Sequence, residues 1–551
     1  MFFRVKQSGP RQYLQIVENA RSNGRVCQRV LTTLGRLDDL KASGHLDGLL
    51  ASGARFAEHV LVLTAHRNGQ VPAVTNQRIG PTLIFERLWQ QTACQQVLAE
   101  LLAGRAFEFP VERAIFLTVL HRLCATGSDR AALRWKEDYR IPGSDELELH
   151  QLYRTMGWLG EHLADNQQQG FSKLVPRCTK DVIEEQLFAR RQDLFSELDI
   201  VFFDTTSLYF EGEGGDTLGQ YGYSKDHRPD LHQMVVGAVL DGEGRPICCE
   251  LWPGNTADVT TLLAVVDRLR QRFRIRRACI VADRGMISDE VVAELEATGR
   301  PYILGVRMRQ QKEVRTHVLN DPKRFRVVYG PRQKSTDPAP LKVKEVKVGT
   351  RRYVVCINAE QVKHDREQRE KIVAALREQL QQGDKSLVGN KGYRRYLKVE
   401  GEGHFEIDEA KLEHEARYDG TWVLRTNTEL SAADVALQYK KLWMVEHWFR
   451  NCKSLLETRP IYHHCDDTIR GHVFCSFLAL VLRQELQARL EARGHHFEWA
   501  DIIRDLERAQ YAEVVQHGRR FLLRSDLQGT AGHVFQSVGV AVPPTVQEVA
   551  G

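Results

Sequence analysis

The chain has 551 residues, and a single domain usually holds roughly 100–200 residues, so we expect several domains. Hydrophobic residues make up 42% of the sequence and charged residues 27%, which are globular values that exclude a disordered, collagen-like or membrane-embedded chain. The 77 Lys and Arg residues exceed the 72 Asp and Glu residues by five, and this small excess indicates no particular partner.

The N-terminal segment has no long apolar core behind its two Phe residues, so no signal peptide is predicted. The most apolar run, 474–482, is far shorter than the roughly 18 apolar residues that a membrane helix needs. The eleven Cys residues form no C-x-x-C pair, and without an export signal they indicate reduced thiols in a cytoplasmic protein. A zinc site made from His463, His464, Cys465 and Cys475 fits no zinc-finger spacing and is disfavoured.

The first third of the chain predicts a β-hairpin region followed by helices. Within residues 1–60, alternating residues on both sides of Asn23-Gly24 predict a hairpin. Residues 61–190 are predicted to be helical, because apolar positions recur at helical spacing from Pro81 onwards. Basic residues of this region fit either the solvated faces of a helix bundle or a DNA-binding surface. They are Arg113, Arg122, Arg130, Arg134 and Lys136.

Residues 191–306 show the pattern of a mixed α/β sheet. The apolar run 198–203 predicts a strand that ends at Asp204. A hairpin of two strands and a helix at 257–273 follow, and then a second buried strand that ends at Asp283. A further helix and strand complete this part. We therefore expect two strands that deliver carboxylates at their C-terminal ends.

Residues 307–428 predict a β-rich basic insertion. Residues 301–352 contain fourteen Lys and Arg against four acids, so the rest of the chain is slightly acidic. This concentrated charge fits either a solvated basic loop or a surface that meets phosphate groups. Helical patterning resumes in residues 429–493, and residues 494–551 are predicted to form a helical tail.

Asp204 and Asp283 are the first candidates for chemistry. One acid at a strand end often caps a turn, but these two strands are expected to be neighbours, which places two carboxylates together. Unpaired carboxylates at close range repel each other unless a divalent cation bridges them. Oxygen ligands with room for water and phosphate suit Mg²⁺ or Mn²⁺. Other nearby acids compete for such a role, although most of them suit turns or helix starts: Asp226, Asp230, Asp258, Asp289 and Glu457.

The helix predicted from Ser431 to Leu456 carries the third candidate. Tyr439, Glu446 and Lys453 are seven residues apart and share one face, which Arg450 joins. Two interpretations of this face are open. It is either an exposed helix surface with ion pairs, or a metal ligand followed by cations that bind phosphate oxygens.

These segments resemble the DDE transposases of bacterial insertion sequences, in the branch with a Tyr-Arg-Glu-Lys signature. The resemblance rests on FFDTT (202–206), VADRG (281–285) and the Tyr-x6-Glu-x6-Lys helix. The loop GYSKDHRPDL (222–231) and the N-terminal hairpin are also similar to that group, so most of residues 13–480 are covered. One position departs from the pattern. Leu442 replaces the family Arg, which removes an expected phosphate-binding side chain or transfers its role to a neighbouring cation: Arg450, Lys453 or Lys441.

The resemblance implies a ribonuclease-H-like core in which Asp204, Asp283 and Glu446 are catalytic and hold two Mg²⁺ ions, with Mn²⁺ as a substitute. It also implies metal-dependent cleavage of DNA at the element's ends and strand transfer into target DNA. Tyr439, Arg450 and Lys453 are expected to bind DNA phosphates. Lys225 and Arg228 either contact DNA or belong to an exposed polar turn.

The implied partners are double-stranded DNA, as terminal inverted repeats and target, and a second copy of the chain in a synaptic homodimer. The basic segment 301–352 and the helical region 61–190 are the expected DNA-binding parts, in a bacterial cytoplasm and at the nucleoid. Two alternatives stay open. One is a related nuclease or resolvase that does not join strands, and the other is a domesticated DNA-binding protein.

Overall fold

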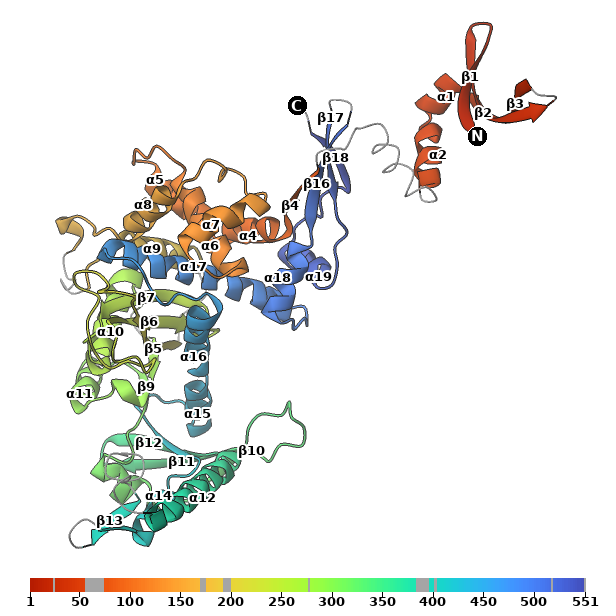
Figure 1. Cartoon of the computed structure of the whole chain (residues 1–551). Coiled ribbons are helices and arrows are strands. Elements are labelled where there is room, and N and C mark those ends of the chain that lie inside the picture. Colours follow the sequence, from red (N-terminus) through yellow and green to blue (C-terminus); the bar gives the residue numbers. More distant parts are fainter. Residues whose placement is uncertain are drawn as a thin grey trace. The chain divides into compact units, whose positions relative to one another are not determined.

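The structure is a computed structural model (Figure 1). It describes residues 1–22, 25–54, 74–168, 175–191, 200–275, 278–382, 396–400, 404–516 and 519–549. These residues form two compact units. The first unit comprises Met1–Asn76, Ala512–Leu523 and Thr545–Gly551, and the second comprises Gln77–Tyr511 and Arg524–Pro544.

An antiparallel three-stranded sheet opens the first unit, with the strand order β1-β2-β3. Its elements and the two helices after it are β1 Phe2–Ser8, β2 Arg11–Ser22, β3 Arg25–Arg36, α1 Leu37–Ala42 and α2 His45–Ala54. The predicted hairpin is confirmed by β2 and β3, in which Ser22 pairs with Arg25, while Asn23 and Gly24 lie outside the described residues. Leu14, Gln15 and Val17 are buried, and register shifts at Leu14/Gln15 and Ile16/Val17 interrupt the strict alternation of β2.

A second sheet has the order β18-β17-β16-β4. Its strands are β4 Val74–Arg78, β16 Gln510–Gln516, β17 Arg519–Arg524 and β18 Val546–Val549. The prediction of a helical tail after residue 494 holds only for α18 Trp499–Glu507 and α19 Ala531–Val538, and it is wrong for the three C-terminal strands. These strands are short, and β4 comes from the distant N-terminal part, so local pattern alone did not reveal them.

The second unit is built on one nine-stranded mixed sheet with the order β10-β11-β12-β15-β9-β8-β5-β6-β7. Its strands are β5 Ile200–Tyr209, β6 Gln233–Asp241, β7 Pro246–Pro253, β8 Cys279–Ala282, β9 Tyr302–Gly305, β10 Arg326–Tyr329, β11 Leu341–Val348, β12 Arg351–Ile357 and β15 Thr421–Thr426. Strand β5 is parallel to β8 and antiparallel to β6, so the two acid-bearing strands are neighbours as predicted. Strands of the segment 307–428 extend this same sheet, and only β13 Leu397–Glu400 and β14 His404–Ile407 pair separately among the strands described there.

Helices cover both faces of the central strands (Figure 1). Phe203 of β5 belongs to the apolar cluster with α10 Asp258–Phe273 and α11 Asp289–Ala297. Phe202, one residue earlier, belongs to the cluster of the opposite face, with α16 Trp443–Arg450 and α17 Asp466–Glu491. The alternation of strand side chains thus assigns each residue of β5 to one face. The result is a mixed α/β, ribonuclease-H-like core.

The remaining helices of the second unit lie mostly before β5 in the sequence. They are α4 Gly80–Gln91, α5 Cys94–Leu102, α6 Val111–Cys124, α7 Asp129–Trp135, α8 Leu149–Gly160, α9 Thr179–Arg191, α12 Ala359–Gln382, α14 Glu409–Ala416 and α15 Ala432–Lys440. Helix α17 packs closely on α8: a Cβ at Gly160 would lie 1.9 Å from the Asp467 carbonyl oxygen, and one at Gly471 2.0 Å from that of Met156. The apolar run 474–482 is buried within α17, and no described helix is long and apolar enough to cross a membrane.

A buried ionic network joins α9 to the sheet and α10. Arg272 pairs with Glu250 at 2.6 Å and also with Glu184, and Arg268 pairs with Glu250 at 2.8 Å. Lys180 and Arg268 hold Asp181 at 2.7 and 3.1 Å. Because all these side chains are almost fully buried, each charge depends on its partners rather than on water.

Candidate active site

Asp204 and Asp283 lie side by side at the centre of the sheet. Phe203 of β5 pairs with Ala282 of β8 in a parallel ladder, and Asp204 and Asp283 are the residues that directly follow this pair. The prediction that the first strand ends at Asp204 is wrong, because β5 continues to Tyr209. Asp283 does follow the last residue of β8, as predicted. Side chains two residues apart on a strand point to the same face of the sheet. Asp204 therefore lies on the same face as Phe202, the face that α16 and α17 cover.

The environment of Asp204 disfavours an isolated negative charge. Burial, together with the negative charges of Asp283 and Asp258, raises the pKa of Asp204 to about 6. Lys225 opposes this effect, as does the backbone N–H of Thr205, which donates to the Asp204 carboxylate at 2.7 Å. A buried carboxylate beside two other carboxylates is well suited to a bound divalent cation, which would offset their repulsion.

Lys225 is held against β5 instead of extending into solvent. Its Nζ donates to the carbonyl oxygen and Oγ1 of Thr205, both at 2.8 Å, and pairs with Asp258 Oδ2 at 3.0 Å. The Thr205 hydroxyl in turn donates to Asp258 Oδ1 at 2.7 Å. Thr205 and Asp258 therefore belong to the site, although the sequence analysis did not consider Thr205 and named Asp258 only as a competing acid. Asp258 starts α10 and looked like an ordinary helix-start acid.

Tyr439 reaches the same acids from α15. Its hydroxyl donates to Asp283 Oδ1 at 2.8 Å, and burial together with Asp283 raises the pKa of the phenol, so it stays a neutral donor. Gly305 of β9 makes room for it, because a Cβ at that position would lie 2.4 Å from the Tyr439 hydroxyl.

The predicted continuous helix 431–456 is wrong in detail. Helix α15 ends at Lys440, residues 441 and 442 form a turn, α16 follows, and Asn451–Leu455 is a π-helical turn. The seven-residue spacing therefore does not define one straight face. Glu446 is an exposed residue of α16, which packs on β5 and β6, and its side chain forms no hydrogen bond or ion pair with another described residue. Leu442 is only 5% exposed, so a charged Arg at that position would be buried in the core.

The predicted phosphate-binding cations differ in their availability. Lys453 is only 11% exposed at its side chain and pairs with Asp226 at 2.8 Å, and Arg459 pairs with the same carboxylate at 3.0 Å. Arg228 is exposed and pairs with Asp230 at 2.8 Å. Arg450 is exposed, with no ion pair among the described parts of the chain. Lys453 thus ties the π-helical turn to the loop 222–231.

Comparisons with known families agree with this arrangement. Residues 196–482 match the model of the Transposase DDE domain, which is more than half of the chain. The chain belongs to the DDE transposase family. Residues 3–64 of the transposase match the IS1634 family transposase, N-terminal domain, which connects it to insertion sequences. A search of curated proteins found no match to the chain.

The matched region begins just before β5 and ends within α17, so it contains both aspartates and the α15–α16 segment. A transposase acts on DNA, and enzymes of this family use divalent metal ions. The family assignment made from the sequence is therefore confirmed, while the roles of individual residues remain predictions.

Proposed function

We propose that Asp204, Asp283 and Glu446 form one catalytic centre that cleaves DNA at the ends of an insertion sequence and joins those ends to target DNA. The observation that carries the proposal is the pairing of β5 with β8, which sets the first two acids next to each other. Glu446 lies on α16, which packs over the face of β5 to which Asp204 belongs.

The residues fit a divalent cation. Asp204 and Asp283 would hold it and Glu446 would complete the oxygen ligands, while Lys225 is the neighbouring side chain that opposes the raised pKa of Asp204. Two Mg²⁺ ions, or Mn²⁺ in their place, would supply charge that stabilises the attacking and departing oxygens of an in-line displacement. Tyr439 orients the Asp283 carboxylate by its hydrogen bond. Lys225 keeps Asp258 and Thr205 in place beside Asp204.

We further propose that DNA lies on exposed cations. Arg450 and Arg228 are exposed near the ends of elements that carry the site. In the basic segment, six exposed side chains make neither an ion pair nor a hydrogen bond with a described residue: Lys312, Arg324, Arg326, Lys334, Lys342 and Lys347. Such cations bind phosphates by releasing counterions. The helical region 61–190 would bind element ends, and a homodimer would hold two ends together in one synaptic complex.

The test uses the full chain with Asp204→Asn, Asp283→Asn and Glu446→Gln as single variants, and Asp289→Asn as the matched control. Each protein is incubated with Mg²⁺ and duplex DNA that carries the element's ends, and the products are mapped. We expect each of the three variants to cut at least about 100-fold more slowly, because loss of even an outer partner of a metal ligand costs about 10- to 100-fold. The Asp289 variant should cut normally, since that residue is exposed on α11.

DNA binding is measured on the same proteins. If Glu446→Gln binds and cuts like the unaltered chain, Glu446 is not the third ligand. Strand-transfer products distinguish transposition from the nuclease alternative, because a nuclease gives cut ends without joined DNA. A domesticated protein would bind the ends and give neither product.

A further inference from the structure

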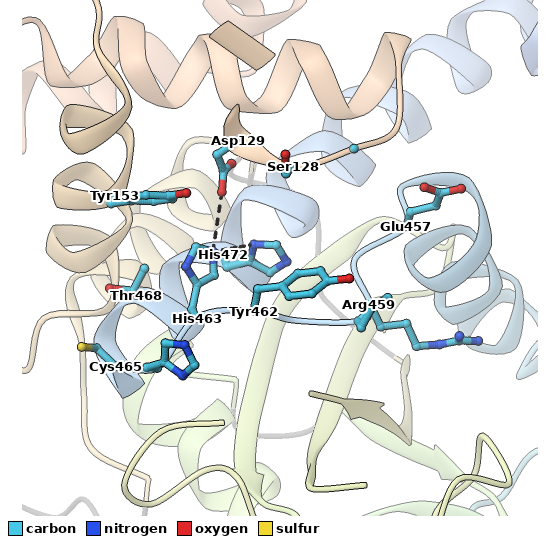
Figure 2. A pocket seen from close by; sticks show the side chains of 13 residues that line it. Ser128, Asp129, Tyr153, Glu457, Arg459, Tyr462, His463, Cys465, Thr468 and His472 are labelled. Atoms are coloured by element: carbon cyan, nitrogen blue, oxygen red, sulfur yellow. Dashed lines mark hydrogen bonds and ion pairs between the residues drawn. The ribbon is translucent and has the colours of Figure 1, made fainter. Parts of the chain in front are cut away.

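A second group of candidate metal ligands contains none of the DDE acids (Figure 2). Asp129 is the first residue of α7, His463 lies in the segment before α17, and His472 lies within α17. One ligand atom from each residue lies within 4.8 Å of the other two. Two distant parts of the sequence, the start of α7 and the stretch 463–472, therefore converge on one point.

Two of the three distances within this group match those between ligands of one ion, and the third is within 4.8 Å. His463 Nε2 lies 3.2 Å from His472 Nδ1 and 3.6 Å from Asp129 Oδ2. Ligands at about 2.0–2.2 Å from a tetrahedral zinc ion are about 3.4 Å apart. The 3.6 Å contact between Asp129 and His463 is an ion pair when His463 is protonated, and it is longer than an ordinary hydrogen bond. An ion bound by both side chains would take the place of this ion pair.

The tautomer of His472 also favours a ligand. Its Nε2 lies 3.1 Å from the carbonyl oxygen of Thr458, an acceptor, so this nitrogen carries the proton. The lone pair of Nδ1 is then directed toward His463. Metal-binding histidines commonly use their second nitrogen in this way, with a backbone carbonyl that fixes the ring.

The positively charged side chain of Arg122 contacts His472 and would repel a metal ion bound there. Its Nη2 lies 2.9 Å from His472 Nδ1, while its Nη1 donates to the carbonyl oxygen of His472 and to Ser476 Oγ, both at 2.5 Å. Ion binding requires Nη2 to leave Nδ1, and the two bonds of Nη1 can keep the guanidinium in place. Without an ion, the same groups would form a hydrogen-bonded chain from Arg122 to His463.

The group opens onto solvent. It lines a pocket of about 720 Å³ together with Ser128, Tyr153 and Thr468, so water can fill a fourth position. Figure 2 shows Asp129 above the two histidine rings, with Tyr462 and Arg459 farther along the pocket.

We propose that Asp129, His463 and His472 bind one zinc-class ion, Zn²⁺ or Co²⁺, with water as the fourth ligand. Two imidazoles and one carboxylate suit these ions, whereas Mg²⁺ prefers oxygen ligands alone. The ion links α7 to α17 and to the segment 459–463, in which Arg459 pairs with Asp226 of the loop 222–231. This site is thus a cross-link between the helical region and the catalytic core.

The experiment uses the full chain with Asp204→Asn and Asp283→Asn, so that ions at the catalytic acids do not contribute. The metal-free protein is titrated with Co²⁺, followed by visible absorption, and then with competing Zn²⁺. We expect one equivalent with the absorption of a four- or five-coordinate ion, and no displacement by millimolar Mg²⁺. Addition of Asp129→Asn or His472→Gln should weaken Co²⁺ binding by at least about 100-fold.

His464→Gln is the matched control, because His464 lines the same pocket but is outside the group, and it should bind Co²⁺ normally. Asp129→Asn keeps the shape of the side chain, and its melting temperature without metal should stay close to that of the parent. Zn²⁺ should raise the melting temperature of the parent and not that of this variant. The proposal is overturned if the parent binds no Co²⁺, or if Asp129→Asn and His472→Gln bind it as tightly as the parent. Loss of binding in His464→Gln would also overturn this ligand set.

Discussion

The Tyr439 hydroxyl donates a 2.8 Å hydrogen bond to the carboxylate of Asp283, although the two residues are 156 positions apart. The bond fixes one carboxylate of the proposed centre and leaves its other oxygen for a cation or for DNA-bound water. We propose that Tyr439 positions this acid, while its predicted contact with a DNA phosphate stays a prediction.

Replacement of Tyr439 by Phe removes only this hydroxyl. We expect kcat for end cleavage to fall about tenfold to a hundredfold, because a hydrogen bond to a charged group contributes about 1.5–3 kcal/mol. Steady-state cleavage at saturating DNA measures it. Tyr418→Phe is the control, since the buried Tyr418 hydroxyl has no hydrogen-bond partner among the described residues. Equal loss in both variants would mean that the effect is a general one of stability.

Gly305→Ala, on strand β9, tests the hydrogen bond between Tyr439 and Asp283 without changing either residue. A Cβ at Gly305 would lie 2.4 Å from the Tyr439 hydroxyl, so the phenol must move away from Asp283. We expect cleavage to fall at least as far as in Tyr439→Phe, and the double variant to be no worse than Gly305→Ala. Gly330→Ala is the control, because a Cβ there meets no atom within 4 Å. Additive losses in the double variant would contradict the shared cause.

Arg272→Met removes one cation from the buried ionic network. Glu250 and Glu184 are almost fully buried and then lose a partner, so we expect the free energy of unfolding to drop by about 3–5 kcal/mol. Urea denaturation measures the change. Arg270→Met, on the exposed side of the same helix, should change stability by less than about 0.5 kcal/mol.

The unpaired cations of the basic segment should set the salt dependence of DNA binding. A triple variant, Arg324→Gln, Arg326→Gln and Lys342→Gln, should lower the slope of log K against log salt concentration by roughly one unit for each DNA phosphate that these side chains no longer neutralise. The control triple variant replaces three arginines that pair with Glu415, Glu313 and Glu345. These are Arg309→Gln, Arg351→Gln and Arg352→Gln. An equal decrease of this slope in both triple variants would contradict the prediction, because paired and unpaired cations would then contribute equally to DNA binding.

Asp505 should contribute stability that depends on pH. The backbone N–H of Thr530 donates to it at 2.8 Å and, with Arg504, lowers its pKa below the ordinary value of 3.8. The folded state therefore favours the charged form, so this stability is present above pH 3.8 and is lost as the pH falls toward the folded pKa. Urea unfolding between pH 5 and about pH 2.5 should show a steeper decline for the unaltered chain than for Asp505→Asn. Parallel curves would contradict the prediction.

Several features of the fold were predictable because they depend on short segments. The alternation on both sides of residues 23–24, and the turn predicted at residues 241–244, predicted antiparallel hairpins, which β2–β3 and β6–β7 confirm. The C-terminal strands were not predictable in this way. Their partner β4 lies at the other end of the chain, and a short strand on its own has little local pattern.

The sequence by itself determined the family, the mixed α/β core and the neighbouring strands with their acids, because strand and helix periodicities and short motifs are local properties of the chain. Only the tertiary structure decided what each charged group contacts. Lys453 pairs with Asp226, 227 positions away, and Lys225 is bound by Thr205 and Asp258. The turn at residues 441–442 likewise breaks a spacing that would be regular in a straight helix. Packing around buried Leu442 and long-range ion pairs set these outcomes, and neither depends on residues that are close in sequence.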